Sequence, residues 1–190
     1  MSFMRMAAVV IGAAGLLAAT PGIANAANDP DTASTVKEGA ASAGTPGFVS
    51  AADEPSVVSF GNEWFTSNER PQDKGYGFVG YAQSTVGGVW QHVMMWRDNN
   101  YVVLESFIND EATDGYCAGA EIRYQVYTGS GWSGYHYRMI PSYDCSTNND
   151  AVNGRYYYSY LKTRNVSSRA CHVNSSGGKI ECEGSWHGPI

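Results

Sequence analysis

Short runs of alternating apolar and polar residues, separated by turn residues, recur through most of this chain. Nine runs rich in β-branched or aromatic residues occupy positions 55–60, 76–83, 88–97, 101–108, 118–128, 134–140, 155–164, 165–173 and 179–184. Segments rich in Gly, Asn and Ser lie between them, at 84–88, 97–100, 128–131, 148–154 and 174–178. About eight or nine short strands at such spacing predict an all-β fold, an antiparallel β-sandwich, with a barrel as the alternative.

The alternation also predicts which side chains share a face, because successive residues of a strand point to opposite sides of its sheet. Three runs are clear in this respect. The shared faces carry Ala120, Ile122, Tyr124 and Val126 in the first run, Val102, Leu104 and Ile108 in the second, and Trp90, His92, Met94 and Trp96 in the third.

The first 26 residues have the pattern of a secretory signal peptide. Arg5 is their only charged side chain, an apolar run follows from Met6 to Ala19, and the small residues Ala24 and Ala26 suit a signal peptidase. The run is shorter than the ~20 apolar residues of a transmembrane helix. We therefore expect residues 1–26 to be removed and the protein to be secreted and extracellular.

The rest of the chain divides by composition at about residue 55. Residues 27–55 carry five acidic side chains against one lysine and few large apolar residues, which predicts a flexible acidic tail. Residues 56–190 have the length of one domain, the predicted sandwich. The net charge of −6 argues against nucleic acids and anionic membranes as partners.

The four cysteines Cys117, Cys145, Cys171 and Cys182 are an even set in a chain predicted to be secreted, so we expect two disulfides. Three connectivities are possible. Residues 165–182 have the pattern strand, turn, strand, which favours a hairpin joined by Cys171 and Cys182 and leaves Cys117 to pair with Cys145. No C-x₂-C pair occurs, and Cys171 and His172 would face opposite ways along a strand. Zinc, other cofactors and a Cys–His catalytic pair are therefore not expected.

Catalytic and calcium-binding residue types are present without a specific motif. His92, His136, His172 and His187 lack the spacing of a metal site, and neither G-x-S-x-G nor G-D-S-G occurs. A hydrolase is therefore a minor alternative. The acidic loop that contains Asp110 and Asp114 lacks the ligand order of an EF-hand, which favours a solvated turn over a calcium site.

Aromatic residues give the strongest indication of a binding surface. The chain has 13 tyrosines and five tryptophans, and in the run 155–164 Tyr156, Tyr158 and Tyr160 share one face while Tyr157 lies on the other. Tyr and Trp combine a large contact area with a polar tip, so they suit recognition of a protein or stacking on a glycan. The alternative is a core built from tyrosine.

One stretch of the tail is a second candidate for partner binding. It could lie extended in a partner's groove or along a sheet edge, or it could belong to a linker or a propeptide. Its residues are Thr45, Pro46, Gly47, Phe48 and Val49.

Residues 108–132 contain a D-x-x-x-D-G turn followed by an A-x-x-R-Y strand, and residues 165–186 contain a closing R-x-C…C hairpin with a tryptophan after it. The matching positions are Asp110, Asp114, Gly115, Ala120, Arg123, Tyr124, Arg169, Cys171 and Cys182. These motifs resemble a family of small secreted β-sandwich proteins from Streptomyces and related actinobacteria. The last element departs from the family's C-x-x-W, because three residues separate Cys182 from Trp186. The match covers about half of the exported chain.

Within that family, a flexible tail before a sandwich is similar to the small adaptor subunits of umbrella toxin particles, which are secreted antibacterial assemblies. The resemblance implies that the tail inserts into a lectin-bearing subunit and that the sandwich sits on a large toxin polypeptide. It implies no catalytic residues.

Together these patterns predict a secreted, non-catalytic adaptor that binds one protein through its tail and another through its sandwich. A carbohydrate-binding module is the first alternative, because the chain is rich in Trp and Tyr. A secreted enzyme inhibitor that acts through the loop at 141–150 is the second.

Overall fold

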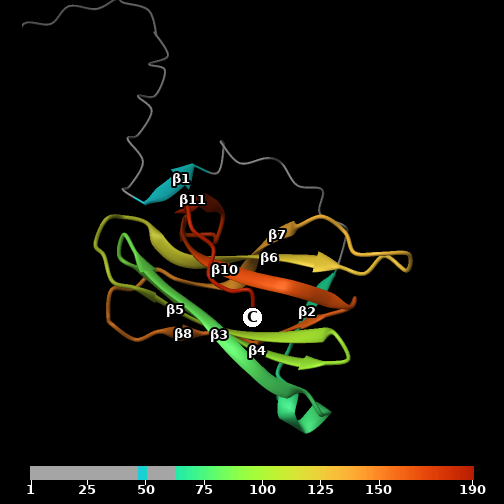
Figure 1. The fold of residues 1–190 in the computed structure, drawn as a ribbon. Helices are drawn as coiled ribbons and strands as arrows, with labels where there is room; N and C mark the ends of the chain where they lie inside the picture. The colour runs from blue at the N-terminus through green and yellow to red at the C-terminus, as the bar shows by residue number, and fades with distance from the viewer. Residues whose placement is uncertain (1–46, 51–62) are drawn as a thin grey trace, which may run out of the picture. The chain divides into compact units, whose positions relative to one another are not determined.

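The computed structural model describes residues 47–50 and 63–190, which form two antiparallel sheets in two layers (Figure 1). The predicted fold class, an all-β antiparallel sandwich, is confirmed. A short 3-10 helix, η2 (Pro71–Lys74), is the only helix that the described residues form. The strands are β1 (Phe48–Ser50), β2 (Trp64–Ser67), β3 (Gly77–Val86), β4 (Val89–Asp98), β5 (Tyr101–Asp110), β6 (Cys117–Val126), β7 (His136–Asp144), β8 (Val152–Asn153), β9 (Tyr156–Ser159), β10 (Thr163–Val173) and β11 (Lys179–Glu183).

The five-stranded sheet has the order β1-β11-β10-β6-β7, and the six-stranded sheet has the order β2-β9-β5-β4-β3 with β8 paired to β5. Two tight hairpins join three strands of the second sheet, β3, β4 and β5. Gly87 and Gly88 link β3 to β4, and Asn99 and Asn100 link β4 to β5, all four with positive φ. Type I′ hairpin turns require this left-handed backbone, which Gly and Asn adopt most readily. The described part of the chain contains no helix that is long and apolar enough to cross a membrane.

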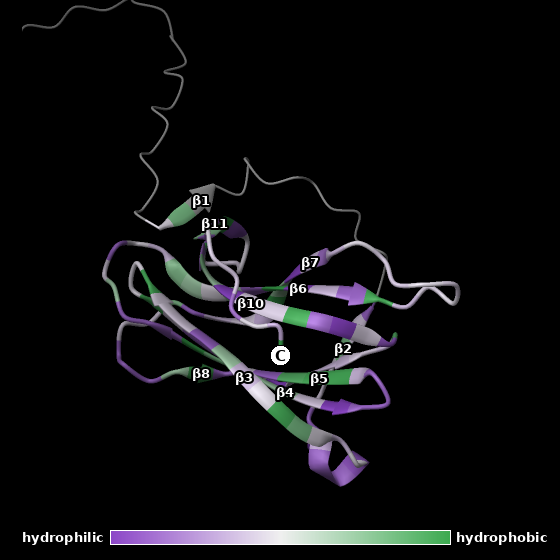
Figure 2. Cartoon of the chain, in the orientation of Figure 1, coloured by the Kyte–Doolittle hydropathy of each residue, from purple (hydrophilic) through white to green (hydrophobic). Residues whose placement is uncertain are grey.

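The core lies between the two sheets and follows the predicted alternation. Ala120, Ile122, Tyr124 and Val126 of β6 are all buried in one apolar cluster, together with Val102, Leu104 and Ile108 of β5. Figure 2 shows apolar residues on strands of both sheets and hydrophilic residues on the turns and on η2. The predicted core faces of these two strands are confirmed.

The described residues form more strands than the eight or nine expected. β1, β2 and β8 have only two to four residues, too few to show a period of two in the sequence. The run 155–164 was predicted as one strand, and this is wrong: β9 ends at Ser159 and β10 begins at Thr163. The first predicted run, 55–60, lies outside the described residues.

Both predicted disulfides are confirmed, and they use all four cysteines. Cys171 of β10 lies directly opposite Cys182 of β11, as the hairpin pattern predicted. Cys117 at the start of β6 is bonded to Cys145, just beyond β7. Two disulfides are compatible with an extracellular protein, because such bonds persist in oxidising compartments.

Candidate binding surface

A row of large side chains crosses the outer face of the six-stranded sheet. The residue pairs in register are Phe65 with Tyr158, Tyr158 with Val103, Val103 with Trp96, and Trp96 with Phe78. One residue from each of β2, β9, β5, β4 and β3 thus lies in a continuous line. Residues directly opposite one another on neighbouring strands have side chains in contact range, so the row is one packed surface. We call these five residues the ring row.

The middle of the ring row is covered and its ends are exposed. Trp96, Val103 and Tyr158 are buried beneath neighbouring side chains such as Tyr76 and Tyr156. Phe65 stacks on Tyr158 with ring centroids 5.4 Å apart. At the other end, Phe78 meets Trp96 edge to face, with centroids 5.6 Å apart. Aromatic pairs in these arrangements hold each other in position, which makes the row rigid.

Exposed apolar side chains flank both ends of the row. Beyond Phe78, which is 54 % exposed, β3 presents Val79 and Tyr81, at 45 % and 59 % exposure. Beyond Phe65, Tyr160 is 55 % exposed and lies 4.5 Å from the Phe65 ring. We call the ring row with Val79, Tyr81 and Tyr160 the aromatic face. Grouped apolar side chains on a surface are typical of a binding site.

A second group of rings adjoins the aromatic face on β4 and its neighbours. His92 stacks on Tyr81 with ring centroids 4.7 Å apart, and Phe107 approaches it edge-on. Burial lowers the pKa of His92 below its ordinary value of 6.5, so this imidazole is uncharged at neutral pH. Burial, the largest cause, and nearby acidic groups raise the pKa of Tyr158 to about 12. These two rings are therefore neutral.

The structure places Tyr156 and Tyr158 on the outer face and Tyr157 in the core between the sheets. Tyr158 is only 5 % exposed, and its hydroxyl donates to the backbone oxygen of Glu69 at 2.7 Å. Its role is thus to support the surface from below. Whether these tyrosines contact a partner stays a prediction.

Sequence reasoning missed Phe65 and the β3 end of the aromatic face. A strict period of two puts Phe78 and Tyr81 on opposite faces, because three positions separate them. The pairing register shifts between Phe78 and Gly80, so that Phe78 faces Trp96 while Tyr81 faces Met94. This bulge brings both rings to the outer face. A glycine inside an apolar strand run is the one sequence signal that could have indicated it.

The tail candidate is only partly within the described residues. Thr45 and Pro46 lie outside them. Gly47 precedes β1, whose backbone pairs with β11. The Phe48 ring stacks on His172 with centroids 4.5 Å apart. The structure therefore places part of the predicted tail on the domain's own sheet edge.

Three of the four histidines each have a glutamate carboxylate within hydrogen-bond distance. Glu63 Oε1 lies 2.8 Å from His136 Nδ1. Glu181 Oε1 lies 2.9 Å from His172 Nδ1. Glu183 Oε1 lies 2.8 Å from His187 Nε2. Within the described ranges, one set of metal-ligand atoms converges, that of Glu121, Cys171 and Cys182. It does not fit a metal, because the two sulfurs are bonded to each other and Arg169 and Lys179 bind the carboxylate.

The acidic loop forms local turns. Asp110 Oδ1 accepts from the Ala112 N–H at 3.2 Å, and Asp114 Oδ1 accepts from the Tyr116 N–H at 2.9 Å. Asp144 reaches the same region and accepts from the Asp110 N–H at 3.1 Å. The first two are the backbone bonds of Asx turns, the alternative to a calcium site that the sequence favoured, whereas the third joins segments that are distant in the sequence.

Asp110 leads to a prediction about pH. Burial of the carboxyl group is the largest cause that raises the pKa of Asp110 above its ordinary value of 3.8. The hydrogen bond from the Ala112 N–H lowers this pKa by a smaller amount. A raised native pKa means that the native state holds this proton more tightly than the unfolded chain, so stability falls as the pH rises through the window above 3.8. We expect Asp110→Asn to gain stability relative to the parent between about pH 3 and pH 7. Urea unfolding at a series of pH values measures this, and a difference that does not change with pH contradicts it.

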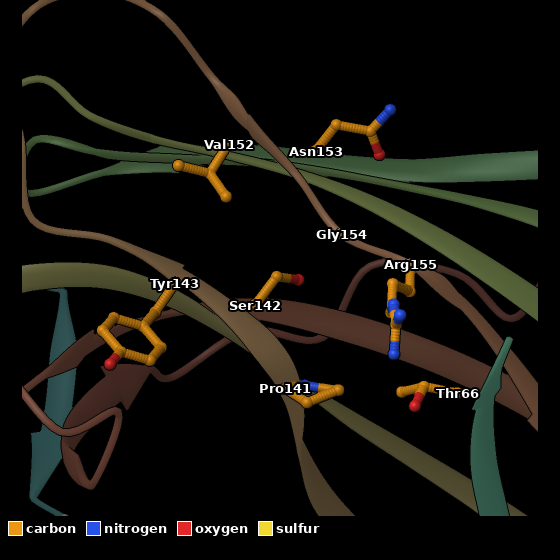
Figure 3. Close-up of a pocket in the computed structure, with 8 residues that line it drawn as sticks. All are labelled: Thr66, Pro141, Ser142, Tyr143, Val152, Asn153, Gly154 and Arg155. Atoms are coloured by element: carbon orange, nitrogen blue, oxygen red, sulfur yellow. The ribbon is translucent and has the colours of Figure 1, made fainter. Parts of the chain in front are cut away.

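A hollow of about 410 Å³ lies where β7, the segment from β8 to β9, and β2 meet (Figure 3). Arg155 points into it beside Thr66, and the Ser142 hydroxyl faces the same space. The hydroxyl oxygens of Ser142 and Ser106 form a hydrogen bond across the sandwich, at a distance of 2.5 Å. This hollow borders the loop at 141–150, which an inhibitor would use. Its lining combines polar and apolar residues and does not group the residue types of a catalytic site.

Comparison with protein-family models, curated proteins and solved structures finds no match to this chain. The resemblance to the actinobacterial family and its toxin adaptors therefore stays a prediction.

Proposed function

We propose that this chain is a secreted, non-catalytic binding module that holds a protein partner on its aromatic face. The ring row carries the proposal, because it crosses β2, β9, β5, β4 and β3 as one packed line of side chains with exposed rings at both ends. Aromatic residues are enriched at protein interfaces and among the side chains that dominate binding energy, and the two ends of the row present Phe65 and Phe78 in this way.

The composition of the aromatic face favours a protein over a glycan. Phe78 and Val79, which are among its most exposed residues, have no polar atom on their side chains. The tryptophan of the row, Trp96, is 3 % exposed and offers no open platform for a sugar ring. Glycan sites instead combine exposed rings with polar groups that bond the sugar hydroxyls.

The sequence extends this proposal to two partners. The signal-peptide pattern at 1–26 and the two disulfides support secretion. The tail at 27–55 would bind one protein while the sandwich binds another, which describes an adaptor. In the toxin assembly that the resemblance implies, these partners would be a lectin-bearing subunit and a large toxin polypeptide.

A matched pair of variants tests the proposal. Phe78→Ser combined with Tyr81→Ser removes two exposed anchors, and Tyr143→Ser removes a ring of 37 % exposure from β7 of the other sheet. Immobilised parent, double variant and control are each incubated with the source organism's culture medium. We expect the parent and the control to retain a protein whose recovery falls about 10-fold or more on the double variant.

Equal recovery on all three proteins contradicts the proposal. A glycan array provides the second measurement. Reproducible glycan binding by the parent that is lost in the double variant would instead establish the carbohydrate-binding alternative. Circular dichroism of each variant verifies that the fold is retained.

A further inference from the structure

The edge of the five-stranded sheet carries a short strand that comes from a distant part of the sequence. Phe48, Val49 and Ser50 of β1 pair with residues 181–183 of β11 in antiparallel register. The Gly184 N–H donates to the Gly47 oxygen at 3.0 Å and extends this pairing by one bond. A segment more than 130 positions away in the chain thus pairs with this edge.

The Phe48 side chain occupies a site that the domain builds from other elements. His172 is 2 % exposed, and its ring is stacked with Phe48 and also with Tyr116, at centroid distances of 4.5 Å and 4.9 Å. Glu181 and the Gly87 oxygen hold the two nitrogens of His172, at 2.9 Å and 3.1 Å. The imidazole is therefore fixed by β11 and the β3–β4 turn, and it offers a flat wall to an aromatic ring.

The position before the phenylalanine is also restricted. Gly47 has φ +91°, in the left-handed region that residues other than glycine rarely adopt. A Cβ atom at this position would lie 3.2 Å from Val86 Cγ1. The site therefore selects the pair Gly-Phe in an extended segment, by backbone conformation at the first residue and by ring stacking at the second.

The described residues of the resident strand pair with only part of the β11 edge. β11 runs from Lys179 to Glu183, and β1 pairs with three of these five residues. A strand of three residues forms few backbone bonds and belongs to the least stable part of a sheet. A longer extended segment could form the same bonds and continue along the edge towards Lys179.

We propose that the β11 edge is a peptide-recognition site for an extended Gly-Phe segment of a protein partner, and that residues 47–50 occupy it in competition with that partner. The partner adds a strand to the sheet, places its phenyl ring on His172 and displaces β1. This surface is separate from the aromatic face, so the two proposals can fail independently.

The test uses a fluorescent peptide with the sequence of residues 44–51, Gly-Thr-Pro-Gly-Phe-Val-Ser-Ala, and the exported chain with its tail intact. Phe48→Ala in the protein removes the resident side chain and leaves the site open. We expect the peptide to bind this variant at least about 10-fold more tightly than it binds the parent, because the competing segment is lost. A peptide with Ala in place of Phe should bind the variant at least about 10-fold more weakly than the first peptide. Fluorescence anisotropy gives both affinities.

Gly47→Val is the second variant, because it unseats the strand through its backbone and leaves the Phe48 side chain in the protein. It should also bind the peptide more tightly than the parent does. Equal affinity for parent and variants, or no binding to a folded variant, overturns the proposal. So does unfolding of both variants, because β1 would then be an integral strand. A parent dimer that Phe48→Ala dissociates would assign the site to a second copy of the chain instead.

Discussion

Replacing Arg169 with alanine should lower the free energy of unfolding by about 3–5 kcal/mol. Arg169 is 2 % exposed, and its Nε donates to Glu121 Oε2 at 3.0 Å. Glu121 is 3 % exposed, so the substitution leaves a buried carboxylate without its main counter-charge. Removing one member of a buried ion pair costs far more than the pair itself contributes, because the remaining charge has lost its solvation. Arg169 also packs on the Trp186 ring, 4.3 Å from its centroid.

Two comparison variants isolate this effect. Arg155→Ala removes an exposed arginine and should change stability by less than about 0.5 kcal/mol. Arg169→Met combined with Glu121→Leu removes both charges and should recover most of the loss, because no uncompensated charge stays buried. Urea unfolding followed by tryptophan fluorescence measures all three. A loss below about 1 kcal/mol for Arg169→Ala would show that Lys179, 3.0 Å from Glu121, neutralises the carboxylate unaided.

Removing the Cys117–Cys145 disulfide should lower the free energy of unfolding by about 3–4 kcal/mol. The bond closes a loop of sequence separation 28, and the cross-link restricts the unfolded chain in proportion to the logarithm of loop length. In the folded state it joins the start of β6 to the chain just beyond β7, where Ala118 already pairs with Asp144. The native strands should therefore stay paired, and the loss should arise mainly in the unfolded state.

The variant is Cys117→Ala combined with Cys145→Ala, which leaves no unpaired thiol at this position. Thr147→Ala, at an exposed site two residues from Cys145, is the control and should change stability by less than about 0.5 kcal/mol. Denaturant unfolding gives the difference. A loss below about 1 kcal/mol would mean that the unfolded chain is restricted in the same way without the bond.

Local patterns in the sequence were sufficient for the fold class, the two main core faces and both disulfides. The alternation at Ala120, Ile122, Tyr124 and Val126 indicated the core directly, because every second residue of β6 faces the other sheet. The turn between Cys171 and Cys182 indicated their pairing, since a hairpin brings opposite residues together. These features depend on neighbours that are close in the sequence.

The features that were missed depend on contacts between distant segments. Alternation assigned Glu121 to the outer side of β6, but it could not show that Arg169 and Lys179 would bind the carboxylate there. The partner of β1 is β11, far away in the chain, so the pairing left no local trace. Of the aromatic face, the sequence indicated Tyr158 and Tyr160 as candidate binding residues. Its exposed end at Phe78 depends on a bulge that simple alternation does not include.

The bulged strand β3 also sets the separation between the two proposed surfaces. Phe78, near its start, belongs to the aromatic face, and Val86, at its end, lies against the Gly47 position of the β11 edge. Tyr81 is the residue of the aromatic face nearest to Val86 along this strand, and the five residue steps of extended strand between them span roughly 16 Å. Under the two proposals, a ternary complex would form with its ligands on separate sites at a fixed spacing. When both sites are occupied, each ligand would be held at a high effective concentration near the other ligand. The protein would therefore bring together two proteins that associate only weakly by themselves.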